Sequence, residues 1–552
     1  MSRVGGGPML QRRLAATIGV LIVCASFLYL FPYSRSLNNP NERTRVLQTR
    51  ALVERGQLHI GTAERSEAGQ LTFVDVDERR HRGLFVNDMA LVCVGPDQEP
   101  PDCEGRLYPA KAPGTSLLGV PTYWLALTLG WVEADPAAEA KATWVMRMGG
   151  VIFPLLIFMG AWWFLLRRLG LDGAVGGAGL IAAMLGTTVY GYGLMFVGHA
   201  TSGAFLLGGI ASVVLGTERR GARTWLLAAA GGALTAYAVM LEYHAVVAVF
   251  TISVWVLAQR RWPVTLGYGL GSGLVAVAFM ALHSAMFGHP LRTGHAFLAS
   301  EHNRVGQGSG FFGIDGLHPG SLLDHLVSPY MGLIPFMPWL ALGGFLGCAL
   351  FFTKRVQTPT RFEVALGSIP LIYLLFVSTL GNWRVMNGWS VGPRYLTPSL
   401  LALSLCAVAA WSHHRRRTMG AVLAGLAAAS VFIVMTTAAA TVSPPDRIFN
   451  TFAEVTVPTL DAGYAVRNLG LGLGWGTASL YIFFALVIAA TLSVLWFGTH
   501  GARHRGRAIL IALLVAVAWT ASLGVLKPHT RTPGQNLEAV EGLHPDGSGE
   551  LF

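Results

Sequence analysis

The chain has 552 residues, of which 53% are hydrophobic and only 12% are charged. Soluble domains carry about 25% charged residues, and the mean hydropathy of this chain is +0.51. The composition excludes a soluble enzyme, a disordered chain and a DNA-binding protein as first interpretations, and it favours a polytopic membrane protein.

Thirteen apolar runs are long enough to cross a bilayer, which takes about 20 residues. They begin near residues 14, 147, 173, 200, 224, 244, 264, 331, 362, 396, 418, 476 and 508. No small-residue cleavage site follows the first run, so we expect it to be retained as a helix. The expected fold is an all-α polytopic membrane protein with about 13 transmembrane helices.

Basic residues indicate which loops face the cytoplasm, because short cytoplasmic loops collect Lys and Arg. The clusters are Arg12-Arg13, Arg167-Arg168, Arg219-Arg220 with Arg223, Arg260-Arg261, Lys354-Arg355, Arg415-Arg416-Arg417, and Arg503 with Arg505 and Arg507. If all are cytoplasmic, the short stretch 115–131, which contains Pro121, lies at the external interface. The alternative is that one cluster is misplaced and this stretch crosses. The net charge of +11 is then a topology signal and no sign of nucleic-acid binding.

This topology divides the chain into four parts. Residues 1–32 form the cytoplasmic N-terminus and first transmembrane helix, and 33–146 form a first external segment with catalytic and interfacial helices. Residues 147–525 form the helix bundle, with external loops near 288–330, 381–395 and 441–475, and 526–552 form an external tail. Polar residues gather in the external segments, so we expect the active side to be external.

Cys93 and Cys103 flank a polar, Pro-rich turn in the first external segment. They can form a disulfide if that segment faces an oxidising compartment; the alternative is two free thiols. Cys24, Cys348 and Cys406 fall in apolar runs and are expected to act as small hydrophobic residues.

Two groups of residues in the first external segment are candidates for chemistry. Pro40 and Asn41 predict a helix start, on which Glu42 and Arg45 share a face; the alternative is a weak surface ion pair. Asp88 is a second acid. Lys111, after Tyr108, precedes the interfacial stretch and is placed to bind a lipid phosphate, or else to anchor the chain at the interface.

Later segments add further candidates. Trp389, Arg394 and Tyr395 lie between two apolar runs, and a charge such as Arg394 at a membrane helix end is costly unless it is paired or functional. His199 and Glu242 fall at predicted external helix ends, where they can line a cavity. No metal site is predicted, because the spacing of His283, His289, His295 and His302 is not that of zinc ligands. Asp75 and Asp77 are expected in a solvated hairpin, since two carboxylates alone bind a cation poorly.

Taken in order, these motifs resemble those of GT-C glycosyltransferases. Glu42-x-x-Arg45 resembles the opening motif of the group that contains lipid A aminoarabinose transferases and protein O-mannosyltransferases (glycosyltransferase family 39). Residues 108–114 are similar to the Lys-Pro-Pro-like stretch before the interfacial helix of that group, and residues 388–396 resemble a Trp-Gly-Pro-Arg-Tyr segment of bacterial members. The similarity covers most of the chain, and no single motif is highly specific. The chain departs from the pattern in having Glu42 where the family usually has Asp, and in the insertion between Cys93 and Cys103.

The resemblance implies transfer of a sugar from a polyprenyl-phosphate donor to a lipid, glycan or protein acceptor, with inversion, on the outer face of a bacterial cytoplasmic (inner) membrane. Glu42 matches the general base, and Asp88 orients the acceptor or is itself the base. Arg45, Lys111 and Arg394 would bind the donor phosphate. The substrate cavity would include Tyr108, Trp389, Tyr395, His199 and Glu242. No cofactor is expected, because the donor enters from the bilayer; a divalent metal is the alternative, with no support in the sequence.

Three other functions remain open at this point. A transporter or flippase predicts charged residues in the middle of spans and inverted repeats, neither of which is evident. A ligase or polymerase of polysaccharide chains would normally carry its largest external loop later in the chain. A membrane scaffold would need no catalytic residues at all.

Overall fold

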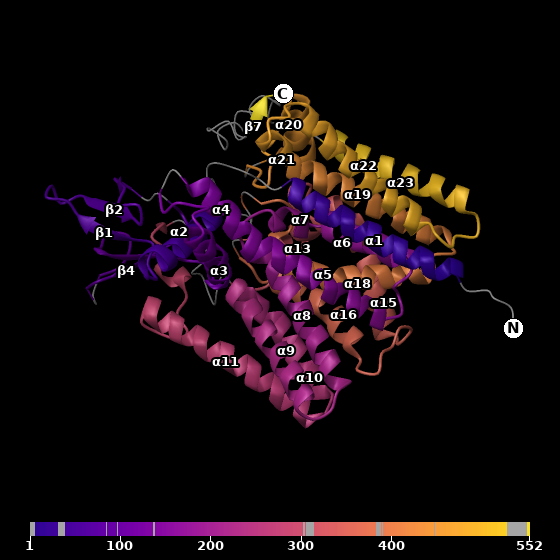
Figure 1. Ribbon diagram of the computed structural model, residues 1–552, viewed down its shortest axis with the longest axis horizontal. Helices are drawn as coiled ribbons and strands as arrows, with labels where there is room; N and C mark the ends of the chain where they lie inside the picture. Colours follow the sequence, from indigo (N-terminus) through magenta and orange to yellow (C-terminus); the bar gives the residue numbers. More distant parts are fainter. Residues whose placement is uncertain are drawn as a thin grey trace.

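The structure is a computed structural model that describes residues 6–30, 39–83, 86–95, 98–135, 138–301, 304, 314–381, 383, 388, 390–445, 448–526 and 549–551. Most of the described chain is helical, as the composition predicts. Figure 1 shows the helices packed into a bundle, with a small sheet projecting from one end of the long axis and the N-terminus at the other end.

Eight of the described helical segments are long and apolar enough to cross a membrane. They are the continuous unit of α4 (Glu139–Arg147), a π-helical turn and α5 (Phe153–Arg168), then α8 (His199–Thr217), α9 (Ala222–Leu241), α11 (Trp262–Phe287), α18 (Thr397–His414) with the turn before it, α19 (Thr418–Ala440), α22 (Ala478–Gly498) and α23 (Arg505–Val525). The prediction of a mostly helical, multi-pass membrane protein is thus confirmed.

Five shorter apolar helices complete the set. They are α1 (Gly6–Tyr29), α6 (Ala174–Leu185), α10 (Val246–Ala258) with the 3-10 turn before it, α15 (Phe345–Phe352) with the π-helical turn before it, and α16 (Phe362–Val377). Each predicted span has a counterpart among these helices and the eight longer ones. How many of them cross the membrane stays a prediction.

One predicted span begins later than expected. The apolar run that starts near residue 331 forms only the single turn α14 (Leu333–Phe336) before the chain breaks at Met337, and helix resumes at Pro338. Pro338 lies at the break; it has no N–H to donate and its ring clashes with the preceding turn. Hydropathy alone does not detect such an interruption.

The first external segment combines two helices with a five-stranded antiparallel sheet. Helix α2 (Pro40–Arg55) comes first, and the strands β1 (Gly61–Arg65), β2 (Leu71–Asp75), β3 (Arg80–His81), β4 (Met89–Cys93) and β5 (Gly105–Pro109) follow in the spatial order β3-β2-β1-β5-β4. Leu47 of α2 packs with Ile60, Phe73 and Leu107 in one apolar core beneath the sheet. The sequence predicts helices here and a hairpin around Asp75. The five-stranded sheet corrects the all-α prediction for this segment.

Helix α3 (Gly114–Thr128) corresponds to the stretch expected at the membrane interface. It has 15 residues, contains Pro121, and is not among the described helices long and apolar enough to span. Trp124 and Trp131 at its far end are 58% and 68% exposed, as suits side chains that sit among lipid headgroups. Whether α3 lies at the membrane interface stays a prediction.

The remaining elements are short. They are α7 (Thr188–Gly193), the 3-10 turn Gly294–Phe297, α13 (Pro319–Val327), the π-helical turn Phe452–Thr456 leading into α20 (Val457–Asp461), α21 (Leu469–Gly472), and the strand pair β6 (Tyr464–Val466) and β7 (Gly549–Leu551). All of them except β7, which follows α23, lie between longer helices along the chain.

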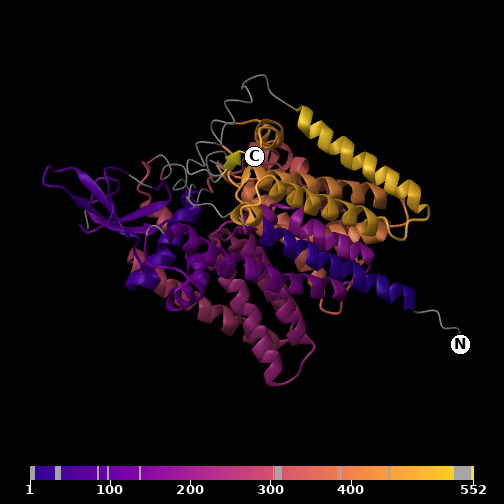
Figure 2. The ribbon, with the colours of Figure 1, turned by 45° about the horizontal axis from the view of Figure 1, so that its top comes forward.

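The basic loops gather at one end of the bundle. Arg168 forms an ion pair with Glu218, Arg261 donates a hydrogen bond to the carbonyl of Thr217, and the carbonyl of Thr360 accepts one from Trp255. These contacts join the clusters near residues 168, 219, 260 and 355. Helix α8, with 19 residues, extends about 28 Å from this end to His199 at the other end. Figure 2 shows the long helices of the bundle lying roughly side by side.

Candidate functional site

A cavity of about 380 Å³ lies where several long helices end next to the five-stranded sheet. Its polar wall consists of side chains from five separate parts of the chain, namely Asn41, Lys111, His199, Glu242, His244 and Arg394. An apolar wall comes mainly from α9, α10, α11 and the segment that follows α11, with Val239, Val246, Val247, Phe279, Met280 and Leu291; the polar side chains of His283, Thr293 and His295 line the cavity from α11 and that segment as well. The cavity therefore joins a charged pocket to a hydrophobic surface.

The sheet fixes the first pair of charges. Strands β4 and β5 pair antiparallel with Met89 opposite Pro109, and the next backbone bond along the ladder runs from the N–H of Ala110 to the carbonyl of Asp88 at 2.9 Å. This register brings Lys111 beside Asp88, with 3.3 Å between Nζ and Oδ1. Burial lowers the pKa of Lys111, and the carboxylate of Asp88 counteracts part of that shift.

Helix α2 supplies the second cation. Its start is well defined, because the side chain of Asn39 accepts hydrogen bonds from two N–H groups of the first turn and Pro40 follows. Arg45 lies one turn later and is fully buried. Its Nη2 is 3.1 Å from Oε1 of Glu242, and burial lowers the pKa of Arg45 while Glu242 raises it. A buried guanidinium needs such a partner.

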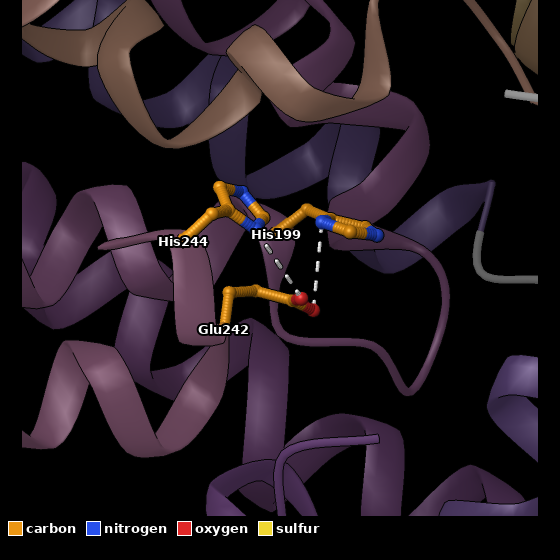
Figure 3. Close-up of side chains that lie close together, drawn as sticks. All are labelled: His199, Glu242 and His244. Carbon is orange, nitrogen blue, oxygen red and sulfur yellow. Dashed lines mark ion pairs between the residues drawn. The ribbon is translucent and has the colours of Figure 1, made fainter. Parts of the chain in front are cut away.

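Glu242 lies at the centre of the polar wall. Helix α9 ends at Leu241, and Glu242 has an extended backbone (φ −147°, ψ 119°) before a 3-10 turn begins. Its Oε1 is 3.4 Å from Nδ1 of His199, and its Oε2 is 4.0 Å from Nδ1 of His244. Figure 3 shows the carboxylate directed toward both imidazole rings.

Glycine allows this close approach. A Cβ at Gly198, which precedes His199, would collide with the carbonyl of Leu241 and crowd the carboxylate of Glu242. A Cβ at Gly114, the first residue of α3, would collide with the backbone of Met240. Both glycines let neighbouring backbones reach the end of α9 and so bring the polar groups together.

Glu42 has a different environment from the one the sequence suggested. It is 3% exposed and does not line the cavity. One oxygen, Oε1, accepts hydrogen bonds from Nε of Arg147 and from the backbone N–H of Phe196, both at 2.6 Å. Glu42 and Arg45 leave α2 toward different partners, so they neither share one pocket as expected nor form the ion pair of the alternative interpretation.

The remaining predicted residues divide between the cavity and its surroundings. Arg394 and Tyr395 line the cavity; the guanidinium lies 5.5 Å from the Tyr395 ring centre. Tyr108 is buried behind the cavity in a smaller apolar cluster, with its ring 5.7 Å from that of Phe287. Trp389 lies outside the described residues. Cys93 and Cys103 form a disulfide that joins the far ends of β4 and β5.

Sequence reasoning did not identify Asn41, Arg147 or His244 as members of the site. Arg147 was assigned to the start of a span, yet a charge beside an apolar run needs a partner, and that signal was available. His244 follows Glu242 by two residues, a spacing whose meaning depends on α9 ending at Leu241. The partner of Asn41 could not be inferred without the fold.

Comparisons with known proteins give structural similarities only. No family model matches the chain, and no curated protein matches it. Two solved structures of ArnT from Cupriavidus metallidurans are similar to it at 14% identity. The apo form covers 94% of this chain and 78% of that one with a TM-score of 0.43. The form bound to undecaprenyl phosphate covers 97% and 88% with a TM-score of 0.48.

The archaeal oligosaccharyltransferase AglB from Archaeoglobus fulgidus, solved with an inhibitory peptide and a dolichol-phosphate, is similar at 11% identity. The match covers 98% of this chain and 61% of that one, with a TM-score of 0.45. What this chain does is therefore inferred below from its own residues.

Proposed function

We propose that this chain is a membrane glycosyltransferase that takes a sugar from a polyprenyl-phosphate donor and transfers it, with inversion, to an acceptor hydroxyl. The observation that carries the proposal is the cavity with one charged wall and one apolar wall. Lys111, Arg394 and Glu242 line the cavity, whereas Arg45 and Asp88 do not line it but pair with Glu242 and Lys111, so that three positive charges stand against two carboxylates. The surplus favours an anionic ligand such as a phosphate ester.

The apolar wall suits the lipid part of such a donor. Val246 and Leu291 line the cavity and are also 54% and 70% exposed on the outside of the molecule. Along α11, Leu270 and Leu274 continue this outward apolar face at 68% and 72% exposure. A polyprenyl chain can therefore lie against α10 and α11 while its phosphate reaches Lys111.

Two features support an external position for the site. The basic loops gather at the opposite ends of the helices that carry His199 and Glu242, and basic loops favour the cytoplasmic side. The disulfide between Cys93 and Cys103 lies in the sheet next to the site, and disulfides persist in oxidising compartments. We propose that the protein lies in a bacterial cytoplasmic membrane with the cavity at its outer face.

Asp88 is the proposed general base. In the free enzyme it pairs with Lys111 at 3.3 Å, and a donor phosphate that binds Lys111 weakens this pairing and makes Asp88 available. The acceptor oxygen then bonds to the anomeric carbon, the bond from that carbon to the phosphate oxygen breaks, and Asp88 takes the acceptor proton. Lys111 and Arg394 stabilise the charge that grows on the departing polyprenyl phosphate.

Glu42 is proposed as a positioning residue. Its oxygen binds the N–H of Phe196, three residues before His199, and so holds the segment that forms one side of the cavity. This proposal changes the role that the family resemblance assigned to Glu42. Asp88, the second acid of the sequence analysis, takes that role instead.

A transporter or flippase remains the second candidate, and the position of the charges argues against it. Transporters place substrate and ion sites near the middle of the membrane, at broken helices. Here the described charged groups lie at helix ends next to the sheet. That arrangement suits chemistry at the level of the lipid headgroups.

The test measures transfer and donor binding separately, with the full chain in nanodiscs and a panel of polyprenyl-phosphate sugars. In Asp88→Asn we expect transfer to fall by about 10²–10⁴-fold and donor binding to persist. In Lys111→Ala, binding itself should weaken. Glu64→Gln, at an exposed position of β1, is the control and should match the wild type. Undiminished transfer in Asp88→Asn would refute the base, and lipid flux with no transfer would favour the transporter.

A further inference from the structure

His199, Glu242 and His244 form a cluster whose chemistry the proposed transfer reaction does not use. Each offers one ligand atom, and these atoms lie within 4.8 Å of one another. All three residues line the cavity, and His199 and Glu242 are 2% and 7% exposed. Figure 3 shows the two rings on either side of the carboxylate.

Several nitrogens of the cluster lack hydrogen-bond partners. Among the described residues, neither ring nitrogen of His199 has one, and Nε2 of His244 has none. His199 is close to Glu242, with 3.4 Å between Nδ1 and Oε1, but the contact does not have hydrogen-bond geometry. Leaving a buried polar group unsatisfied is costly, so these atoms call for a ligand.

The surroundings hold the imidazole rings in place. The ring of His244 stacks on Phe376 with 5.7 Å between centres and meets Tyr395 edge-on at 5.3 Å. The ring of His199 meets Tyr192 edge-on at 5.0 Å. Aromatic packing of this kind fixes ring orientation, which a metal site requires of its ligands.

We propose that His199, Glu242 and His244 bind one divalent zinc ion. Two imidazoles and a carboxylate, with a fourth position left open, are a ligand set that zinc uses at catalytic sites. Bonds of about 2.0–2.2 Å require the ligand atoms to move closer together than the present limit of 4.8 Å. The open position faces the cavity that all three residues line.

Arg45 does not exclude the ion. It binds Oε1 of Glu242, but an ionised carboxylate has about four lone-pair sites on two oxygens. Oε2, which faces His244, is available to a metal while Arg45 keeps its hydrogen bond. The ion adds positive charge beside Lys111 and Arg394, so an anionic fourth ligand would stabilise it. That such a ligand is the donor phosphate rests on the proposed function, whereas the metal site itself does not.

The sequence pattern predicts His199 and Glu242 as cavity residues but not as metal ligands, because the ligands come from two helix ends. The histidines considered for zinc were those near residues 283–302, whose spacing is unsuitable. His199 begins α8, whereas Glu242 and His244 follow α9. Only the hairpin of these two helices, with its residues 198 and 241 in contact, brings the ligands together.

The test measures zinc content and affinity of the full chain, purified without a polyhistidine tag, stripped with a chelator and titrated with zinc alone. Elemental analysis should find one zinc per chain, and cobalt substitution should give the visible absorption of a nitrogen and oxygen site. His199→Ala, His244→Ala and Glu242→Gln should each bind at least 100-fold more weakly. His283→Ala removes a histidine that lines the same cavity outside the cluster, and it should bind as the wild type does.

Folding is checked by gel filtration and thermal unfolding, and Glu242→Gln keeps the shape of the side chain if an alanine variant fails to fold. Absence of stoichiometric zinc in the wild type, or equal affinity in wild type and Glu242→Gln, would overturn the site. Because no lipid or sugar is present, zinc binding can succeed while sugar transfer fails, and the two proposals are judged separately.

Discussion

The carboxylate of Glu42 and the guanidinium of Arg147 form a buried ion pair, with 2.6 Å between Oε1 and Nε. The same oxygen accepts the N–H of Phe196. One side chain thus ties α2 to α4 and to the segment before α8. A carboxylate held in this way is suited to fixing the shape of the site.

Replacing Glu42 tests this structural role. Glu42→Gln removes the charge that balances the buried Arg147, and breaking a buried pair costs about 3–5 kcal/mol. We expect a lower thermal midpoint, with less loss in the double variant Glu42→Met, Arg147→Met, which removes both charges. Unfolding in detergent, followed by fluorescence, measures both. A Glu42→Gln variant that is as stable as wild type but inactive in transfer would assign catalysis to Glu42 instead.

Lys111 gives a pH-dependent prediction. Burial lowers the pKa of Lys111, so its charge is complete below the lowered pKa and is lost as pH rises through it. Binding of a polyprenyl phosphate should therefore weaken with rising pH before the ordinary lysine value of about 10.4 is reached. Lys111→Arg keeps its charge throughout and should bind with little change over the same range.

The control for Lys111→Arg is Lys141→Arg, at an exposed position of α4, which should keep the wild-type pH profile. Lipid binding to nanodiscs, measured from pH 7 upward, follows both variants. Identical profiles for wild type and Lys111→Arg would show that Lys111 does not contact the phosphate.

Gly198 is expected to tolerate no side chain. In Gly198→Ala the new Cβ meets the carbonyl of Leu241 and the carboxylate of Glu242, and overpacking of this kind costs about 1–3 kcal/mol. His199 should move away from Glu242, so that zinc affinity and sugar transfer fall together. Gly273→Ala, where no atom lies within 4 Å of the new Cβ, is the control and should leave both unchanged.

The disulfide should stabilise the external sheet. Cys93 and Cys103 are separated by 10 positions, and closing a loop of that length is worth about 2–3 kcal/mol. Cys93→Ser should lower the thermal midpoint, and a reductant should lower that of the wild type equally while leaving the variant unaffected. Cys24→Ser, a change at a free cysteine, should behave as the wild type. A reductant effect that persists in Cys93→Ser would trace the loss to another thiol.

The helices could be predicted from the sequence because each one is an apolar run of suitable length. The break at Pro338 was missed since it lies inside such a run. The sheet was also missed, apart from the hairpin at Asp75, because strands of five residues leave a weak pattern. In that hairpin Asp75 binds His81 at 2.9 Å and Asp77 binds Arg50 at 2.8 Å, so both carboxylates have protein partners.

The residues of the site could be predicted from the sequence better than the ion pairs that they form. Four members of the site were predicted because each is a polar residue at the end of an apolar run. All four line the cavity, namely Lys111, His199, Glu242 and Arg394. Which charge pairs with which could not be predicted. Helical spacing places Glu42 and Arg45 on one face of α2. Their actual partners, Arg147 and Glu242, depend on how α4 and the end of α9 pack against α2.

The position of Asp88 beside Lys111 is set by the pairing of β4 with β5, whose other ends the disulfide joins. The described residues 94, 95 and 98–102 lie beyond that covalent link, at the other end of the strands from Asp88 and Lys111. Changes in the hairpin connection therefore do not affect the positions of Asp88 and Lys111. Its length and composition can change by insertion or deletion without altering the separation of the two charges, whereas a shift of one position in the strand pairing would turn Asp88 to the opposite face.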